Sequence, residues 1–356
     1  MFFGVMAVIR SVFQAIGGEI SDRMDRRVIL IQAQAIRSVA LMMLAISIAL
    51  NWGFWPISIF LTINSIVGAI FQPVANAMVS DILPQSKRLD GYAITRSASN
   101  LGWAVGPAMG GFLAHQSYAV LFVIAAVITT IASVVFHIFL KSVPTEKAAN
   151  KFKLSDLVAI KSDPIFGWHI SLTFVLFLVV AQLIGPFSLY AVQIVGITEI
   201  QLGFLFSLNG LLVVLAQVPM TRFLSGTKLT TQLIIGSIIY AVGYSTMGLG
   251  SSFFFFMIPI IVVTIGEVTM SPPSLALASR MAPKGRMGRY MGIYGFVTAA
   301  GWSFGPLYGG IILDHLAHDT PFFAWVAISS LALLPAFGYY LFQRRLDAKI
   351  DRPGPI

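Results

Sequence analysis

One carboxylate, Glu267, stands in the middle of an apolar stretch of about 28 residues (253–280). An ionised carboxylate near the centre of a bilayer costs ~3 kcal/mol on insertion scales, so burial there favours the neutral form. A carboxyl group that alternates between neutral and charged forms is what proton coupling or cation binding requires. Two other interpretations stay open, namely a permanently neutral glutamic acid bonded to a neighbouring helix and a structural ion pair with a buried arginine. We expect Glu267 to take part in proton coupling or substrate binding.

A second set of polar residues recurs every four positions in the apolar segment 54–80. Asn64, Gly68 and Gln72 have this spacing, which places them along one side of a helix. A polar stripe within a membrane-spanning helix faces a wet cavity more often than lipid. Asn64 and Gln72 are therefore predicted to line a substrate cavity.

Three arginines, Arg10, Arg37 and Arg96, are embedded in apolar segments. Arg96 lies about five residues inside its segment, so its side chain can reach the interface by snorkelling. At least one of the three is expected to pair with a carboxylate, and Glu19 is a candidate partner for Arg96. Of the three, Arg96 is the strongest candidate for a substrate or gate contact.

No set of residues typical of an enzyme is present. The chain has no cysteine, and its five histidines show no metal-binding spacing on a helix. A phosphate-binding loop, a nucleophile elbow and paired catalytic carboxylates are also missing from the sequence. We therefore expect no enzymatic activity, no metal site and no cofactor.

The segments that carry these residues are long, apolar and separated by short connections. The chain is 57% hydrophobic and 10% charged, against about 25% charged residues in a soluble domain. Runs of about 20 apolar residues recur along nearly the whole length, and each is long enough to span a bilayer as a helix. We predict an all-α polytopic membrane protein with eleven spans. The predicted spans are residues 1–20, 28–50, 54–80, 92–115, 118–140, 164–190, 199–222, 231–250, 253–280, 291–315 and 320–343.

The net charge of +9 is explained by topology rather than by a nucleic-acid partner. Of the 23 lysine and arginine residues, 20 fall in alternate connections or in the tail, and the opposite connections contain none. The positive-inside rule makes the basic side cytoplasmic. We expect a multi-pass protein of the plasma membrane, surrounded by the lipid bilayer, with a cytoplasmic C-terminus and no nucleic-acid partner.

The chain contains an internal repeat. Residues 102–111 (GWAVGPAMGG) reappear 199 positions later as residues 301–310 (GWSFGPLYGG), and 11 of the 39 positions from 73 to 111 are identical in this register. Chance would supply roughly two or three identities. Glycines spaced four apart leave a smooth helix face that another helix can approach closely, and the proline permits a kink. The residues of this helix-packing motif are Gly102, Gly106, Pro107, Gly110, Gly111, Gly301, Gly305, Pro306, Gly309 and Gly310.

The repeat divides the chain into two membrane bundles. We expect an N-terminal bundle of five spans (1–140), a cytoplasmic linker (141–163), a C-terminal bundle of six spans (164–343) and a cytoplasmic tail (344–356). The repeated motif lies in the fifth span of the second bundle but in the fourth span of the first. The repeat therefore predicts one more helix upstream of Met1, and a truncated or misassigned start is favoured over a complete protein with eleven spans.

The connection between the first two spans reads GEISDRMDRR (18–27). It resembles the cytoplasmic signature of the major facilitator superfamily, Gly-x-Leu-x-Asp-Arg-x-Gly-Arg-Arg, with Asp25 in place of the second glycine. The glycine–proline motif resembles one that the drug:proton antiporters of this superfamily carry in their fifth helix. Asn64 is a departure, because many of those antiporters have an arginine there, four residues before a glycine.

The resemblance assigns roles to the charged residues of this connection. Asp22 is expected to cap a helix N-terminus or to face one across the interface between bundles. Arg23 and Arg26 are expected to pair with Asp81 and so to latch one conformation. A minimal alternative is that the arginines only set the topology.

The resemblance also implies secondary active transport by alternating access, in which protons drive the export of lipophilic or cationic small molecules. In this hypothesis Glu267 carries the proton or meets a cationic substrate, while Asn64, Gln72 and Arg96 line the cavity. The partners are then a small-molecule substrate and protons, and a monomer is expected. Two alternatives stay open: a facilitator or symporter for a small polar nutrient, and a truncated remnant that does not transport.

Overall fold

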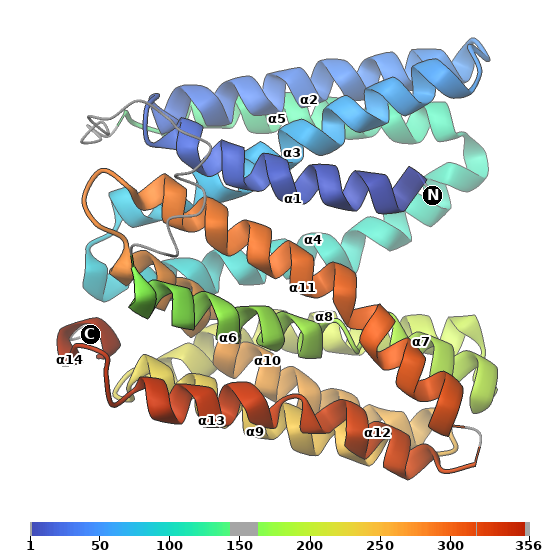
Figure 1. Cartoon of the computed structure of the whole chain (residues 1–356). Coiled ribbons are helices and arrows are strands. Elements are labelled where there is room, and N and C mark those ends of the chain that lie inside the picture. Colours follow the sequence, from blue (N-terminus) through green and yellow to red (C-terminus); the bar gives the residue numbers. More distant parts are fainter. Residues whose placement is uncertain (1, 143–162, 318, 353–356) are drawn as a thin grey trace. The chain divides into compact units, whose positions relative to one another are not determined.

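The computed structural model describes residues 2–142, 163–317 and 319–352. It does not describe the side chains at 2–11, 104, 107, 108, 110–112 and 114–116, nor most of the predicted linker. Within the described ranges the secondary structure is helical, in agreement with the predicted all-α polytopic fold. The helices of the first half are α1 (Phe2–Ser21), α2 (Arg26–Ala49), α3 (Phe54–Ile82), a 3₁₀ turn (Gln85–Lys87), α4 (Arg88–Gln116) and α5 (Tyr118–Phe139) (Figure 1).

The helices of the second half follow the predicted spans except at two interruptions. The predicted span 164–190 consists of α6, a turn, the short α7 and a π-helix, because Pro186 has no N–H to continue the ladder of backbone hydrogen bonds. The predicted span 320–343 is divided into α12 and α13. The elements are α6 (Pro164–Val180), α7 (Pro186–Leu189), the π-helix (Tyr190–Ile194), α8 (Glu199–Phe223), α9 (Leu229–Met247), α10 (Phe253–Met281), α11 (Met287–Leu316), α12 (Pro321–Ser330), α13 (Leu333–Phe342) and α14 (Ala348–Asp351).

Local sequence explains where several of these helices begin. Asp163 accepts a hydrogen bond from the backbone N–H of Phe166 (2.9 Å), and Pro164 occupies the first turn of α6, where its missing donor is not needed. Thr198 and Gln201 form a reciprocal capping box at the start of α8. These contacts satisfy N–H groups that a helix start leaves without partners.

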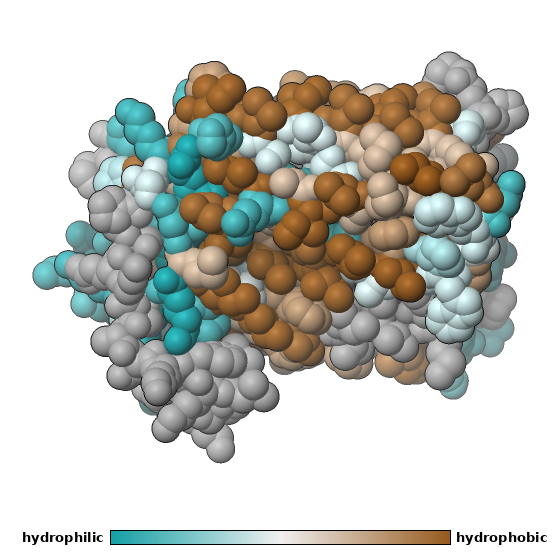
Figure 2. All heavy atoms as spheres, turned by 90° about the horizontal axis from the view of Figure 1, so that it is seen from above, coloured by the Kyte–Doolittle hydropathy of each residue, from teal (hydrophilic) through white to brown (hydrophobic). Residues whose placement is uncertain are grey.

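Seven helical segments within the described residues are long and apolar enough to cross a membrane. They are α2, α3, α5, α8, α10, α11 and the segment Pro321–Phe342. Many large apolar side chains on them are exposed, among them Ile36, Val39 and Ile59. Figure 2 shows hydrophobic residues over the middle of one face and hydrophilic residues gathered towards its ends. This distribution is that of a protein embedded in a bilayer.

The register of the repeat extends over whole helices. Shifted by 199 positions, the bounds of α3 (54–82) coincide with those of α10 (253–281), and α4 (88–116) coincides with α11 (287–316) to within one residue. The gapless register therefore gives each residue of α3 and α4 a counterpart in the second half.

The helices gather into two compact units that interleave along the sequence. The first unit comprises residues 1–84, 105–159 and 282–296, and the second comprises 85–104, 160–281 and 297–356. Each unit therefore includes the starting turns of a long helix from the other half of the sequence: α11 in the first unit and α4 in the second. These two helix starts carry most of the contacts described below.

Each unit has an apolar core of its own. In the first unit, Ile29 and Leu30 of α2 pack against Val74 and Met78 of α3. In the second unit, α9 packs against α10, α12 and α13, and a group of aromatic rings is buried around Trp325. The rings that contact Trp325 are those of Phe187, Tyr190 and Tyr244.

Candidate functional site

Arg96 and Glu267 form an ion pair in the second unit. Arg96 projects from the third turn of α4, and its Nη2 donates to Oε1 of Glu267 near the middle of α10. The side chain of Glu267 is 11% exposed and that of Arg96 is 25% exposed, so solvent screens the pair only in part. The ion pair joins a helix of the first half of the sequence to a helix of the second half. Two of the predicted site residues, far apart in the sequence, are thus brought together.

The other carboxylate oxygen of Glu267 accepts a hydrogen bond from Asn209 of α8. Asn209 Nδ2 lies 3.1 Å from Glu267 Oε2 and 2.8 Å from the hydroxyl oxygen of Thr264, one turn earlier on α10. Sequence reasoning missed Asn209, although an amide within an otherwise apolar span is a signal that could have identified it. The carboxylate is therefore held at both oxygens by groups from two different helices.

Glu19 does not pair with Arg96, which corrects the expectation from sequence. Its Oε2 lies 2.7 Å from Nε of Arg289, its Oε1 lies 3.1 Å from Nη2 of the same residue, and Arg23 also donates to Oε1 (2.8 Å). All of these residues belong to the first unit. Depth in the membrane placed Glu19 and Arg96 at similar levels, but it carried no information on which unit each residue belongs to.

Asp22 caps the N-terminus of α11. Its carboxylate accepts the backbone N–H groups of Gly288 (2.6 Å) and Arg289 (2.8 Å), and also the guanidinium of Arg26 (2.9 Å). Burial raises the pKa of Asp22 above its ordinary value, and the three donors only partly oppose that shift. The positive end of the α11 dipole adds to this interaction. Asp22 therefore connects the 18–27 connection to a helix of the second half.

Arg26 is the residue that pairs with Asp81. Its Nη1 donates to Asp81 at the end of α3, while its other nitrogens bond to Asp22 and to Ser21 Oγ (3.2 Å). Arg23 pairs with Glu19 instead, so only one of the two arginines expected to contact Asp81 does so. The fork of the Arg26 guanidinium is what allows one cation to reach three acceptors at once.

Asp25, which replaces the second glycine of the signature, starts α2. Its φ is −61°, outside the range that favours glycine, and its side chain accepts the backbone N–H of Arg27 (2.8 Å). The connection therefore needs no glycine at this position, because an aspartate N-cap satisfies the start of the helix.

The sequence matches the family model described as "Major Facilitator Superfamily" over residues 1–226 and again over residues 170–355. The chain belongs to the major facilitator superfamily. The uncharacterized transporter YttB of Bacillus subtilis (strain 168) is 29% identical over 276 residues, which cover 73% of this chain and 66% of YttB. The quinolone resistance protein NorA of Staphylococcus aureus (strain MSSA476) is 20% identical over 341 residues, which cover 92% of this chain and 84% of NorA.

The same fold is found in solved transporters. The crystal structure of the human organic anion transporter MFSD10 matches with a TM-score of 0.82 at 17% identity, covering 95% of this chain and 82% of that one. Membership of the superfamily makes this chain a multi-pass membrane transporter for small molecules rather than an enzyme.

The other two predicted cavity residues of this transporter, Asn64 and Gln72, lie on α3 in the first unit. Asn64 Oδ1 accepts from Nε of Arg37 (3.1 Å), whose Nη1 also bonds to Gln34 (3.2 Å). Gln72 is exposed. The guanidinium of Arg37 also lies beside Gly68, at an ordinary contact distance of 3.8 Å from the place a Cβ would take. Asn64 and Gly68 of the predicted stripe therefore contact Arg37 of α2. The side chain of Arg10 lies outside the described residues.

The two copies of the glycine motif differ in what covers them. In α11, a Cβ on Gly301 would lie 2.7 Å from Phe177 Cβ, and one on Gly305 would lie 2.5 Å from Ala181 Cβ, so these glycines permit close contact with α6. In α4, a Cβ on Gly102 or Gly106 would meet nothing within 4 Å among the described residues. Among the described residues, close packing is thus seen at Gly301 and Gly305 and not at Gly102 or Gly106. The 199-residue register assigns α6 no counterpart between residues 1 and 356.

Several other motif positions carry less information. Gly309 leaves space for the amide of Gln182 and the ring of Pro186, and Pro306 packs against Gly185. Gly310 has nothing within 4 Å, and the side-chain surroundings of residues 107, 110 and 111 lie outside the described part of the chain.

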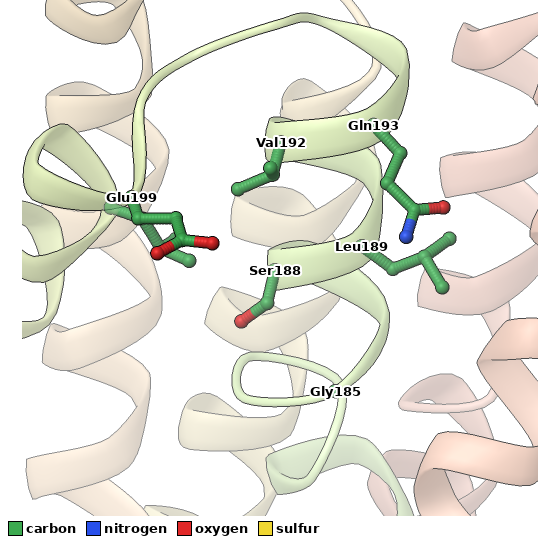
Figure 3. A pocket seen from close by; sticks show the side chains of 7 residues that line it. Gly185, Ser188, Leu189, Val192, Gln193 and Glu199 are labelled. Carbon is green, nitrogen blue, oxygen red and sulfur yellow. The ribbon is translucent and has the colours of Figure 1, made fainter.

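A separate open pocket of about 510 Å³ lies beside the π-helix of the second unit. Figure 3 shows Ser188, Val192 and Glu199 around a common space, at the turn where the π-helix leads into α8. π-Helical turns occur frequently at functional sites. Glu267 and Arg96 are not among the residues of this pocket. Its lining residues are Gly185, Ser188, Leu189, Val192, Gln193, Glu199 and Leu202.

Proposed function

We propose that this transporter exports lipophilic or cationic small molecules in exchange for protons, and that Glu267 carries the proton. The observation that carries the proposal is the ion pair between Glu267 and Arg96, set within the apolar part of the second unit. A carboxylate in such surroundings is costly unless it is paired or protonated, and the two states differ by one proton.

The position of the ion pair explains how a proton would act on conformation. Arg96 belongs to α4 of the first half, and Glu267 belongs to α10 of the second half, so their attraction opposes separation of these helices. Protonation of Glu267 removes the negative charge and leaves the guanidinium of Arg96 without its counter-ion. The Nε of Arg96, which is buried, has no hydrogen-bond partner among the described residues, so the arginine is only partly satisfied even in the pair. The helices separate more readily once the charge is gone.

A second tie between the halves is the cap that Asp22 places on α11. Together with Arg26 and Asp81 it forms a buried cluster at the end of the first unit where basic connections gather. In the proposed cycle these contacts hold the cytoplasmic side closed. Breaking a buried charge cluster by removing one partner costs about 3–5 kcal/mol, so they must be exchanged for other contacts when that side opens.

The proposed substrate class rests on the aromatic residues near Glu267 and on one relative. Tyr240 and Tyr244 of α9 lie within electrostatic range of the carboxylate, and aromatic rings beside a negative charge favour lipophilic cations over sugars or other polyols. NorA, which is 20% identical, is named for quinolone resistance, in agreement with export of drug-like compounds.

We also propose the membrane arrangement that the charges favour. The basic connections and the C-terminus are cytoplasmic, and the protein lies in the plasma membrane as a monomer. The functional bundles correspond to residues 1–140 and 164–343, joined by the linker 141–163, while residues 344–356 form the tail.

The test is transport of ethidium, a lipophilic cation, by the purified full chain in liposomes with an imposed pH gradient. We expect Glu267→Gln to abolish uptake driven by the gradient while the protein stays folded and monodisperse. Asp314→Asn serves as a matched control, because Asp314 is an exposed carboxylate near the end of α11, outside the ion pair and the pocket, and it should transport normally. Unchanged transport by Glu267→Gln would remove Glu267 from the mechanism.

A further inference from the structure

The two oxygens of Glu267 have different neighbours, and this difference controls where a proton can bind. Oε1 accepts from Arg96, and Oε2 accepts from Asn209 Nδ2 at 3.1 Å. A proton on either oxygen would neutralise the same charge. Only a proton on Oε1 would displace the guanidinium, so the choice of oxygen decides whether protonation breaks the ion pair.

The orientation of the Asn209 amide follows from the groups around it. The Thr264 hydroxyl donates its single proton to the carbonyl of Ile260 (2.7 Å), so towards Asn209 its oxygen acts as an acceptor. The carboxylate oxygen of Glu267 is also an acceptor. An amide NH₂ group has two protons and can satisfy both at once, whereas its carbonyl oxygen would satisfy neither. Thr264 therefore holds Asn209 with its NH₂ group towards Glu267.

This arrangement disfavours a proton on Oε2. A proton there would have to displace the N–H of Asn209, which Thr264 holds in place, whereas a proton on Oε1 displaces the guanidinium of Arg96, whose partly exposed side chain can move away. The proton therefore binds at Oε1: an O–H bond forms with a proton delivered by water, the carboxylate loses its charge, and the hydrogen bond from Arg96 Nη2 breaks. We propose that Asn209, oriented by Thr264, is a positioning residue that directs protonation of Glu267 to Oε1. Proton binding is thereby coupled to release of α4 from α10, a conclusion that rests on the proposed proton-carrying role of Glu267.

Among the described residues, the charged and phenolic groups that act on Glu267 come from α4 and α9. From α9, Tyr240 and Tyr244 lie within electrostatic range of the carboxylate, and phenols are neutral near pH 7. From α4 the facing charged group is Arg96, and from α8 it is the neutral Asn209.

The chain lacks cysteine, so a single introduced thiol can report the separation of α4 from α10. Ser279 at the end of α10 is fully buried, and its carbonyl accepts from Arg88 at the start of α4 (3.2 Å). In a Ser279→Cys background, the rate of maleimide labelling measures how often this contact opens. Glu267→Gln imitates the protonated residue: its amide must present oxygen to Asn209 and its NH₂ group to Arg96. We expect labelling to rise by about tenfold, the factor equivalent to ~1.4 kcal/mol.

The decisive variant is Thr264→Val added to Glu267→Gln. Without the hydroxyl, the Asn209 amide can turn, and the glutamine side chain introduced at position 267 can keep its oxygen towards Arg96. Labelling should therefore return to within about twofold of the parent protein. Thr264→Ser retains the hydroxyl and should leave labelling at the higher rate. Asn209→Ser, whose hydroxyl can donate or accept, should act like Thr264→Val and replaces it if that variant does not fold.

The outcomes separate this inference from the proposed function. If Glu267→Gln changes neither labelling nor ethidium transport, the proton-carrying role of Glu267 fails, and the inference fails with it. If Glu267→Gln raises labelling but neither Thr264→Val nor Asn209→Ser reverses the rise, the positioning role is overturned while the proposed function stands. Reversal by Thr264→Val and none by Thr264→Ser is the expected result.

Discussion

Replacing Gly305 by alanine should destabilise the protein, whereas the same change at Gly106, its counterpart 199 positions earlier, should not. At Gly305 the new Cβ would lie 2.5 Å from the Cβ of Ala181 and 2.8 Å from the carbonyl oxygen of Leu178. Real Cβ contacts essentially never fall below 3.0 Å, and part of this one is with helix backbone, so α6 and α11 must move apart. At Gly106 the described residues place nothing within 4 Å.

The magnitude follows from two opposing effects. Overpacking a tight contact costs about 1–3 kcal/mol, while alanine in place of glycine within a helix contributes roughly 0.5–1 kcal/mol of stability. The net loss at Gly305 is therefore about 1–2 kcal/mol. At Gly106 only the favourable effect remains. With about 2–4 °C of melting temperature per kcal/mol, Gly305→Ala should melt ~2–8 °C lower, and Gly106→Ala should melt at the same temperature or slightly higher.

The assay is thermal unfolding followed by intrinsic tryptophan fluorescence, with both variants and the parent chain in the same detergent. The six tryptophans supply the signal without a label. Equal melting temperatures for Gly305→Ala and the parent would show that α6 and α11 are not in close contact at this glycine. An equal decrease in both variants would show that the two copies of the motif are packed alike, against the difference described here.

Two further changes test contacts at the ends of the helices. Asp351→Ala removes a buried carboxylate that accepts the backbone N–H (2.9 Å) and the hydroxyl (2.8 Å) of Thr230 at the start of α9. Loss of such a cap costs ~1 kcal/mol, so the melting temperature should fall by a few degrees, while Asp314→Ala, which removes an exposed carboxylate of α11, should leave it unchanged. Arg26→Lys keeps the positive charge but removes the forked guanidinium that contacts Asp22, Asp81 and Ser21 together. Ethidium transport should fall at least tenfold with little loss of folded protein. Normal transport by this variant would show that the cluster does not act as a latch.

Helix positions were largely predictable because hydropathy reports the length and depth of a span. The predicted boundaries of α3 and α10 lie within two residues of the observed ones. Hydropathy did not predict the places where a span is interrupted, because the sequence there remains largely apolar. Residues 181–185 between α6 and α7 (AQLIG) contain one polar residue, Gln182, and no charge, so Gly185-Pro186 was the main signal of the turn. The division of the last span into α12 and α13 had the same cause.

The sequence singled out the two members of the Arg96–Glu267 ion pair, but it did not predict that they pair with each other. The cost of burying charge identified Arg96 and Glu267 independently of any structure. To predict the pair, one would have to know that the start of α4 contacts α10. Periodicity within single helices carries no information on such long-range contacts. Asn209 was missed for a related reason, because one amide in a span is an ordinary feature until a carboxylate is known to face it.

The 199-residue register between the halves shows that the charged residues of the ion pair occur in one copy of the repeat only. Glu267 corresponds to Gly68, and Arg96 corresponds to Gly295, so both members of the ion pair in the second unit are glycines at the equivalent positions of the first. The first unit instead ties α11 to the first half through Asp22, which caps backbone N–H groups and keeps those partners whatever the charge of Glu267. If both ties depended on a carboxylate in the middle of a span, two protons would have to bind before the helices could separate. With one such tie, a single protonation at Glu267 suffices, and a coupling of one proton per cycle is the simplest stoichiometry for the proposed exchange.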